Sequence, residues 1–221
     1  GGNILISGSP TFATGTNGRA TLYSGSISGS TGLTALVGSG SGRFRYNADE
    51  TTDFSTGGRA ALGTGVYAIY REQPTASVTV GNQTITYGDS LGTVTGTSTG
   101  MVNGDTPTYG ANGAVYSTAN KIQAGSYTLT ATGLAALGYN VGGNNGTLTV
   151  NTKALTLSGF AAANKTYDGS QTATISSTGS LSGLIAGDLV SVAHSGATFD
   201  TKDVGTGKTV TLNGVTLTSG N

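Results

Sequence analysis

The feature that most constrains the fold of this sequence is an internal repeat with a period of about 80 residues. The segment Thr86-Tyr87-Gly88-Asp89 returns as Thr166-Tyr167-Asp168-Gly169. A Gly-Asp step follows in each copy, at Gly104-Asp105 and at Gly187-Asp188. Tandem modules of this kind serve length and display far more often than catalysis.

Composition excludes several classes of function. Only 9% of the 221 residues are charged, against about 25% in ordinary soluble domains, and the formal net charge is zero. A neutral surface does not attract phosphate backbones or anionic lipid, which argues against nucleic-acid binding. No apolar run approaches membrane-spanning length, so membrane insertion is not expected. The absence of cysteine removes disulfides and thiolate chemistry.

The distribution of basic residues marks a domain boundary. All five arginines lie at or before Arg71, and all five lysines lie at or after Lys121. Pro74 falls between them and imposes an extended connection. We therefore expect three parts, at residues 1–73, 74–151 and 152–221. The opening Gly1-Gly2-Asn3-Ile4 is typical of an internal segment, so a fragment of a longer protein is expected.

Residues 1–73 show short strand patterns about 20 residues apart and no helical periodicity. The expected strands are Asn3–Ile6, Ala20–Tyr23, Arg43–Tyr46 and Val66–Tyr70. This spacing fits the last coils of a parallel β-helix. The exposed edge of a last coil needs protection, and the cations of Arg43-Phe44-Arg45-Tyr46 are suited to blunting it.

The two repeats predict small all-β modules. Val78 and Val80 alternate with polar residues, as do Leu148 and Val150, and this period of two indicates half-buried strands. Residues 133–138 are the one place where a helical turn is expected. A β-sandwich-like module is favoured, with a β-grasp-like module as the alternative. Expected strands of the first module are Ala76–Val80, Thr84–Thr86, Gly92–Gly96, Thr108–Val115, Ser126–Ala131 and Gly146–Val150.

Two features concern how the modules are joined. Only four residues separate Val150 from Leu155, so the connection is expected to be stiff. The second copy has no counterpart of Gly146–Val150, and we expect residues 152–221 to lack their last strand. The resulting open edge would accept a strand from a neighbour.

These motifs resemble a known family of bacterial exoprotein modules. Thr86-Tyr87-Gly88-Asp89 with Asn145–Val150 resembles the MBG module (YGX type), and Lys165–Gly169 resembles the YDG module. Arg43–Glu50 and Tyr67–Pro74 resemble the stretch that joins a β-helix to such modules in filamentous-haemagglutinin-like, two-partner-secretion adhesins. The resemblance implies secretion to the bacterial cell surface and a role in adhesion, aggregation or biofilm matrix. It brings no catalytic residues.

The sequence offers candidates for two kinds of binding site. Ca²⁺ prefers several carboxylate and carbonyl oxygens, and the candidates for a calcium site are Asp188, Asp200 and Asp203. Aromatic platforms for host or matrix glycans could be formed by four tyrosines, Tyr109, Tyr116, Tyr127 and Tyr139. No calcium loop motif is present, and tyrosine is also an ordinary strand residue.

Four further patterns suggest chemistry that the surrounding sequence does not support or leaves open. Gly205–Thr209 imitates a phosphate-binding loop, but a strand follows and the loop predicts a hairpin turn. His194 is the single histidine and fits an exposed polar residue better than a Ser/His/Asp triad or a zinc site. Glu50 and Glu72 do not form a hydrolase pair. Lys165 could enter a Lys–Asn isopeptide bond.

The sequence thus predicts a non-enzymatic, all-β segment without a cofactor: the end of a parallel β-helix followed by two tandem modules. The expected role is a structural or adhesive stalk of a secreted bacterial surface protein. Expected partners are neighbouring modules or other copies of the same exoprotein. The alternatives are a glycan-binding module and a filament subunit assembled by strand donation.

Overall fold

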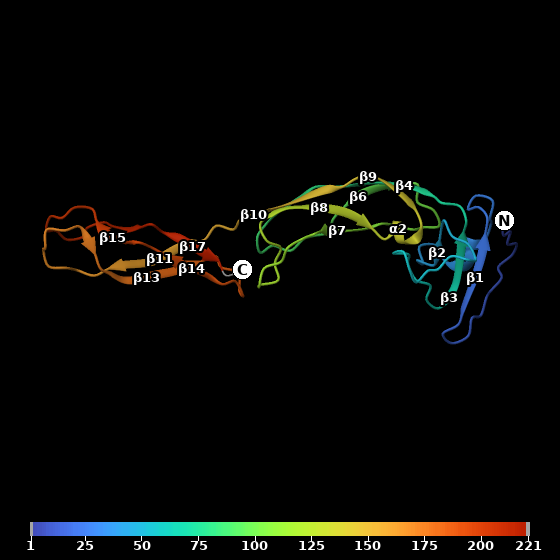
Figure 1. Ribbon diagram of the computed structural model, residues 1–221, viewed down its shortest axis with the longest axis horizontal. Helices are drawn as coiled ribbons and strands as arrows, with labels where there is room; N and C mark the ends of the chain where they lie inside the picture. The colour runs from blue at the N-terminus through green and yellow to red at the C-terminus, as the bar shows by residue number, and fades with distance from the viewer. Residues whose placement is uncertain (1, 220–221) are drawn as a thin grey trace. The chain divides into compact units, whose positions relative to one another are not determined.

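The computed structural model describes residues 2–219 and is almost entirely β (Figure 1). Within this range only two short helices occur, α1 (Leu33–Val37) and α2 (Leu134–Leu137). The all-β prediction is therefore confirmed, and α2 falls where a helical turn was expected. The chain forms two compact units. Of the described residues, one unit comprises 2–83, 91–113 and 126–148, and the other comprises 84–90, 114–125 and 149–219.

The N-terminal segment contains a small parallel sheet. Its strands are β1 (Arg19–Ser24), β2 (Phe44–Arg45) and β3 (Gly65–Tyr70), in the order β1-β3-β2. Both neighbours run parallel to β3, and the last four residues of β3 are buried. Parallel pairing is what stacked β-helix coils require, but β3 lies between β1 and β2, so the three strands do not stack in sequence order. The β-helix itself stays a prediction, and the expected strand at residues 3–6 makes one parallel bridge, Leu5 to Thr31.

Arg45 departs from the sequence interpretation. Its cation was expected to blunt a sheet edge, but the residue is only 3% exposed. Its guanidinium donates hydrogen bonds to the carbonyls of Ala60, Gly42, Phe44 and Ala61 at 2.7–2.8 Å. A guanidinium presents five donors in a fixed fork, and here the fork holds two segments of the chain together.

The first module is built from two small sheets. In one, β4 (Thr75–Val80) pairs antiparallel with β6 (Gly96–Thr99) and parallel with β9 (Asn140–Asn144). The other has the order β5-β10-β8-β7. Its strands are β5 (Gln83–Thr86), β7 (Thr108–Asn112), β8 (Gly125–Thr132) and β10 (Gly146–Asn151).

Burial in the first module follows the alternation in its sequence. Along β4 and β10 every second residue is buried, including Val78, Val80, Leu148 and Val150. Two expectations were inaccurate. The strand expected at residues 92–96 is β6 and begins only at Gly96, and β9 was not expected.

The second module contains β11 (Thr156–Ala162), β12 (Thr172–Ala173), β13 (Ile175–Ser182), β14 (Val190–Ala193), β15 (Gly196–Phe199), β16 (Val210–Asn213) and β17 (Thr216–Ser219). These pair as β11-β13, β12-β15-β16 and β14-β17. Only Ala173 and Ala197 are buried hydrophobic residues among the described part of this module, so its core is thin. The predicted missing last strand concerns positions after Ser219 and lies outside the described residues.

Candidate functional site

A buried carboxylate joins the N-terminal segment to the first module. Asp105 is 4% exposed and accepts hydrogen bonds from Tyr46 at 2.6 Å and from Tyr139 at 3.0 Å. The Asn103 amide donates to the Tyr46 hydroxyl at 3.1 Å. Tyr46 also stacks on Tyr70, with ring centroids 5.8 Å apart. We call Tyr46, Asp105 and Tyr139 the first joint.

Electrostatics identify the first joint as a structural contact. Burial raises the pKa of Asp105 and that of Tyr46, and it raises the pKa of Tyr139 to about 12. Both phenols therefore stay protonated and remain donors at neutral pH. Each hydroxyl directs its proton at the carboxylate, which compensates for removing that carboxylate from water.

The Gly-Asp steps of the two repeats adopt corresponding turns. In the first, Asp105 N–H donates to Val102 O, and in the second Asp188 N–H donates to Ile185 O, both at 3.0 Å. Gly104 and Gly187 both have positive φ, at 77° and 99°. Glycine adopts this backbone without strain, which explains its position directly before each aspartate.

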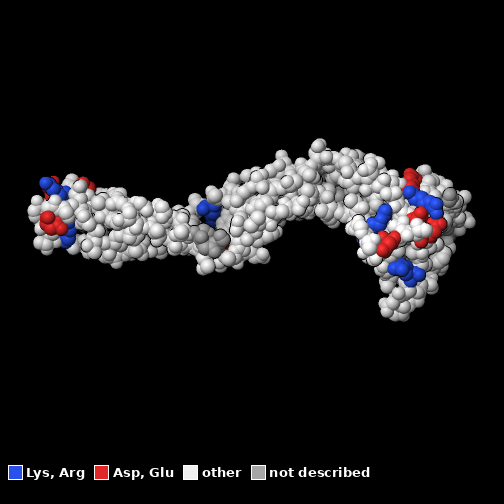
Figure 2. Space-filling view, viewed as in Figure 1, with Lys and Arg blue, Asp and Glu red and all other residues white. Residues whose placement is uncertain are grey.

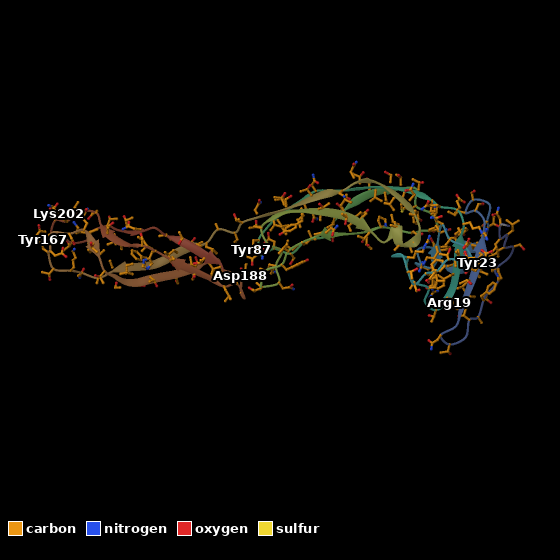
Figure 3. All side chains as sticks on the ribbon, viewed as in Figure 1. Arg19, Tyr23, Tyr87, Tyr167, Asp188 and Lys202 are labelled. Atoms are coloured by element: carbon orange, nitrogen blue, oxygen red, sulfur yellow. The ribbon has the colours of Figure 1, made fainter. Side chains whose placement is uncertain are left out.

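The second turn is held by residues at the end of the first module. The Tyr87 hydroxyl donates to Asp188 Oδ1 at 2.5 Å, and it lies 2.8 Å from Ser117 Oγ. Thr118 Oγ1 donates to the carbonyl of Gly187 at 3.0 Å. Burial, followed by the hydrogen bond to Asp188, raises the pKa of Tyr87, which keeps it a donor. Figure 3 labels Tyr87 and Asp188, and we call this contact the second joint.

Two glycines allow the close approach at the second joint. A Cβ on Gly88 would lie 2.5 Å from Cδ1 of Ile185, and one on Gly187 would lie 3.4 Å from Cβ of Ala119. The backbone at Gly88 also has positive φ, at 98°. The Tyr-Gly-Asp motif therefore supplies a donor, a gap for Ile185 and a turn in three consecutive residues.

The far end of the second module carries an open groove of about 510 Å³. We call it the tip groove and define it by Tyr167, Phe199 and the loop 200–208. Lys165 Nζ donates to Asp168 at 2.7 Å, and Lys208 Nζ lies 3.2 Å from Asp200. On the face shown in Figure 2, charged atoms gather over the N-terminal segment and over this tip. Between residues 73 and 152 the sequence has three charged residues, Asp89, Asp105 and Lys121.

The calcium candidates are not brought together. Asp188 lies in the second joint, whereas Asp200 and Asp203 lie on the loop that contains Lys202, at the other end of the module (Figure 3). Asp200 is paired with Lys208. No cluster of three or more potential metal-ligating side chains occurs in residues 2–219.

The tyrosines considered for glycans have different environments. Tyr139 is 4% exposed and belongs to the first joint, so its assignment to an exposed sugar platform was wrong. Tyr109 and Tyr127 are half-buried, and Tyr116 is 55% exposed. The residue after Tyr116 is Ser117, whose hydroxyl takes part in the second joint.

The remaining candidates from the sequence are His194, Lys165 and the loop 205–209. His194 was expected to be exposed but is half-buried. Lys165 Nζ donates to Asp168 Oδ1 and to Ser170. The loop 205–209 leads into strand β16, as expected for a hairpin and not for a phosphate-binding loop.

Sequence reasoning did not identify the two joints. The signal was available, because the repeated threonine-tyrosine and Gly-Asp motifs were recognised as turns. Local sequence does not predict which tyrosine contacts which aspartate. At the second joint Tyr87 contacts Asp188, which lies about 100 positions away in the chain.

Comparison with known families matches both repeats. Residues 76–149 match the family model of the MBG domain (YGX type), and residues 151–221 match that of the YDG domain. Such domains are typical of extracellular or surface proteins. No curated protein and no solved structure matches the chain.

A search of residues 2–219 for membrane-crossing helices found none of sufficient length and apolar character.

Proposed function

We propose that this chain is a non-enzymatic spacer segment of a secreted bacterial surface protein. In this role the MBG and YDG domains hold an adhesive or aggregating part of the same protein at a fixed distance from its attachment. The observation that carries the proposal is the pair of tyrosine–aspartate joints. At each one, a part of the chain is fixed to the next by charge-assisted hydrogen bonds at 2.5–3.0 Å.

The surface chemistry supports the same role. Hydroxyl and amide groups dominate, formal charge is zero, and charged residues make up 9% of the chain. A surface of this kind does not attract polyelectrolytes. At both joints the tyrosines and carboxylates take part in hydrogen bonds between parts of the chain.

The proposal is tested by replacement in the gene that encodes this chain. Deleting the codons for residues 76–219 should leave export intact and reduce cell aggregation or adhesion. An unrelated pair of rigid β modules of similar length, inserted at the same place, should restore it. Restoration shows that the segment provides distance.

Two outcomes would contradict the spacer role. If deletion has no effect on aggregation or adhesion, the segment provides no necessary distance. If only the native modules restore the phenotype, the segment itself binds a ligand. A glycan-binding role would then be examined with Tyr116→Ala, because Tyr116 is the most exposed of the four glycan candidates.

A further inference from the structure

The end of the second module is built like the face that holds the Gly187–Asp188 turn at the second joint. That face consists of Tyr87 and the loop 117–121. Through the repeat, Tyr87 corresponds to Tyr167, since each follows a threonine and opens a glycine-containing turn. The tip groove therefore contains the counterpart of the tyrosine donor at the second joint.

The loops beside the two tyrosines also correspond. Each follows an aromatic residue, Tyr116 or Phe199, and each is closed by a main-chain hydrogen bond at its base. Ser117 N–H donates to Lys121 O at 2.8 Å, and Asp200 N–H donates to Thr209 O at 3.0 Å. Thr118, which holds the Gly187 carbonyl, thus has Thr201 as its counterpart. The tip loop is the longer of the two.

The two faces differ in whether they are covered. At the second joint Tyr87 is half-buried against Asp188. At the tip Tyr167 is 60% exposed and Val204 is 85% exposed. The turn at Gly169 is open as well, because a Cβ placed there would meet no described atom within 4 Å.

We propose that the tip groove is a docking site for the Gly-Asp turn of a further β module built like the second one. Tyr167 would donate to the incoming carboxylate, as Tyr87 does to Asp188. Thr201 would donate to the carbonyl of the incoming glycine, as Thr118 does to Gly187. The Thr201 oxygen already accepts from Lys208 Nζ at 2.6 Å, so its own proton is available for donation.

Charge at the tip groove favours a carboxylate. Lys202 occupies the position of Ala119, the residue that approaches Gly187 in the second joint. Lys202 is exposed, and Figure 3 shows it close to Tyr167 at the same end of the module. Asp200 replaces Ser117, but it is already paired with Lys208 at 3.2 Å. An ammonium group beside an incoming aspartate adds electrostatic attraction.

One substitution restricts which module fits. Asp168 replaces Gly88, whose missing side chain makes room for Ile185 at the second joint. The Asp168 carboxylate is turned toward Lys165 and the backbone of Ser170. A module that docks here should therefore carry a residue smaller than isoleucine at the position of Ile185.

The test uses an extended chain in which residues 1–219 are followed by a second copy of residues 133–219. Gly220 occupies the place of Gly133 in the repeat, so the added residues supply α2, β9, β10 and a further module in order. In the added copy, Ile185→Ala removes the expected clash with Asp168. A double-mutant cycle then combines Tyr167→Phe with Asp188→Asn of the added copy and measures denaturant unfolding.

We expect the two changes to be coupled by roughly threefold to tenfold in the unfolding equilibrium constant. Tyr87→Phe with the original Asp188→Asn serves as the reference pair. Tyr116→Phe is the matched control, because Tyr116 is similarly exposed and should show no coupling. Absence of coupling at Tyr167, with coupling retained in the reference pair, would overturn the proposal. So would an added module that stays unfolded, since the tip groove is proposed to support it.

A second measurement reports proximity directly. The chain has no cysteine, so Lys202→Cys and Gly187→Cys of the added copy form the single possible disulfide pair. Ala119→Cys with the original Gly187→Cys is the reference, since their Cβ positions would be 3.4 Å apart. Rapid disulfide formation in both pairs supports docking, and formation in the reference pair alone contradicts it.

This inference deepens the proposed spacer function, on which it rests, because docking at the tip would let modules continue in the same manner. The two can fail separately. A spacer that is restored by unrelated modules remains a spacer even if Tyr167 shows no coupling to an added aspartate.

Discussion

At the scale of single residues, tyrosine hydroxyls and buried or half-buried aspartates carry the contacts between successive parts of this chain. A protonated phenol that donates to a carboxylate forms a short, strong hydrogen bond without bringing a second charge into the interface. This suits a sequence with very few charged residues. It also makes the stability of each joint depend on one carboxylate and on the phenol hydroxyls that donate to it, which single substitutions can remove.

Tyr87→Phe removes the hydroxyl that donates to Asp188 at 2.5 Å and leaves the ring in place. We expect the second module to lose about 1–2 kcal/mol of unfolding free energy, because the carboxylate keeps its charge and loses a donor. Urea unfolding measures the loss. Tyr116→Phe is the control, since its side chain is 55% exposed and should cost less than about 0.5 kcal/mol. Equal effects of the two changes would contradict the importance of the joint.

Asp105 makes the first joint sensitive to pH. Burial raises its pKa above the ordinary value of 3.8, so the folded state binds the proton more readily than the unfolded state. Its contribution to stability is therefore fully present below the unfolded pKa and is lost as pH rises through the folded pKa. Each unit by which burial raises the pKa corresponds to about 1.4 kcal/mol.

The expected result is a pH-dependent difference between wild type and Asp105→Asn. Several exposed carboxylates, including Asp49, Asp53 and Asp168, have lowered pKa values and lose stabilising interactions as pH falls. These groups are present in both proteins, so they cancel in the difference. Thermal unfolding between about pH 4 and 8 should show wild type gaining on the variant as pH falls. A difference that stays constant across this range would refute the assignment.

At the scale of secondary structure, the sequence predicted strands wherever apolar residues alternate. It predicted β4 and β10 closely, because Val78, Val80, Leu148 and Val150 point to one side and are buried. It missed β9, because Asn140-Val141-Gly142-Gly143-Asn144 has the composition of a turn. That strand is specified by its neighbour β4, which approaches it too closely for side chains, and not by local propensity.

The same limit applies to the joints. A turn that ends in Gly-Asp can be predicted from local sequence, since glycine supplies the positive φ. Its partner cannot, because Tyr46 and Tyr87 are distant from Asp105 and Asp188 along the chain and lie in different sequence contexts. Arg45 was misread for a related reason. Its four carbonyl partners become visible only once the chain is folded.

Gly143 and Gly142 allow a matched test of the β4–β9 contact. A Cβ on Gly143 would lie 1.8 Å from the carbonyl oxygen of Val78, and its φ is 125°. Gly143→Ala should therefore destabilise the first module by about 2–4 kcal/mol. At Gly142 the nearest atom would be 3.9 Å away, so Gly142→Ala should change stability by less than about 0.5 kcal/mol. Similar denaturation midpoints for both variants would show that β9 is not held as described.

At the scale of the whole molecule, the compact units divide the first module. Its Tyr87 turn, residues 84–90, and its loop 114–125 group with the second module. The reason lies in the second joint, which takes Tyr87 from the turn and Ser117 and Thr118 from the loop. A module that lends its end to the next one is stabilised there by its neighbour, so neighbouring modules should lose protection together at that end.

Asp188→Ala tests this coupling by hydrogen exchange. The change removes the acceptor for Tyr87 and should raise exchange in residues 84–90 and 114–125, although both segments lie far from position 188 in sequence. Residues 126–148 belong to the other compact unit and should keep their protection. Asp203→Ala is the control, because Asp203 lies on the tip loop. The hydrogen bonds that Asp203 makes there use its main-chain N–H and carbonyl, which the substitution keeps. Two outcomes would contradict this role: faster exchange in the same segments for both variants, or an equal rise in exchange throughout the first module. In either case the second joint would not hold the Tyr87 turn and the 114–125 loop to the second module.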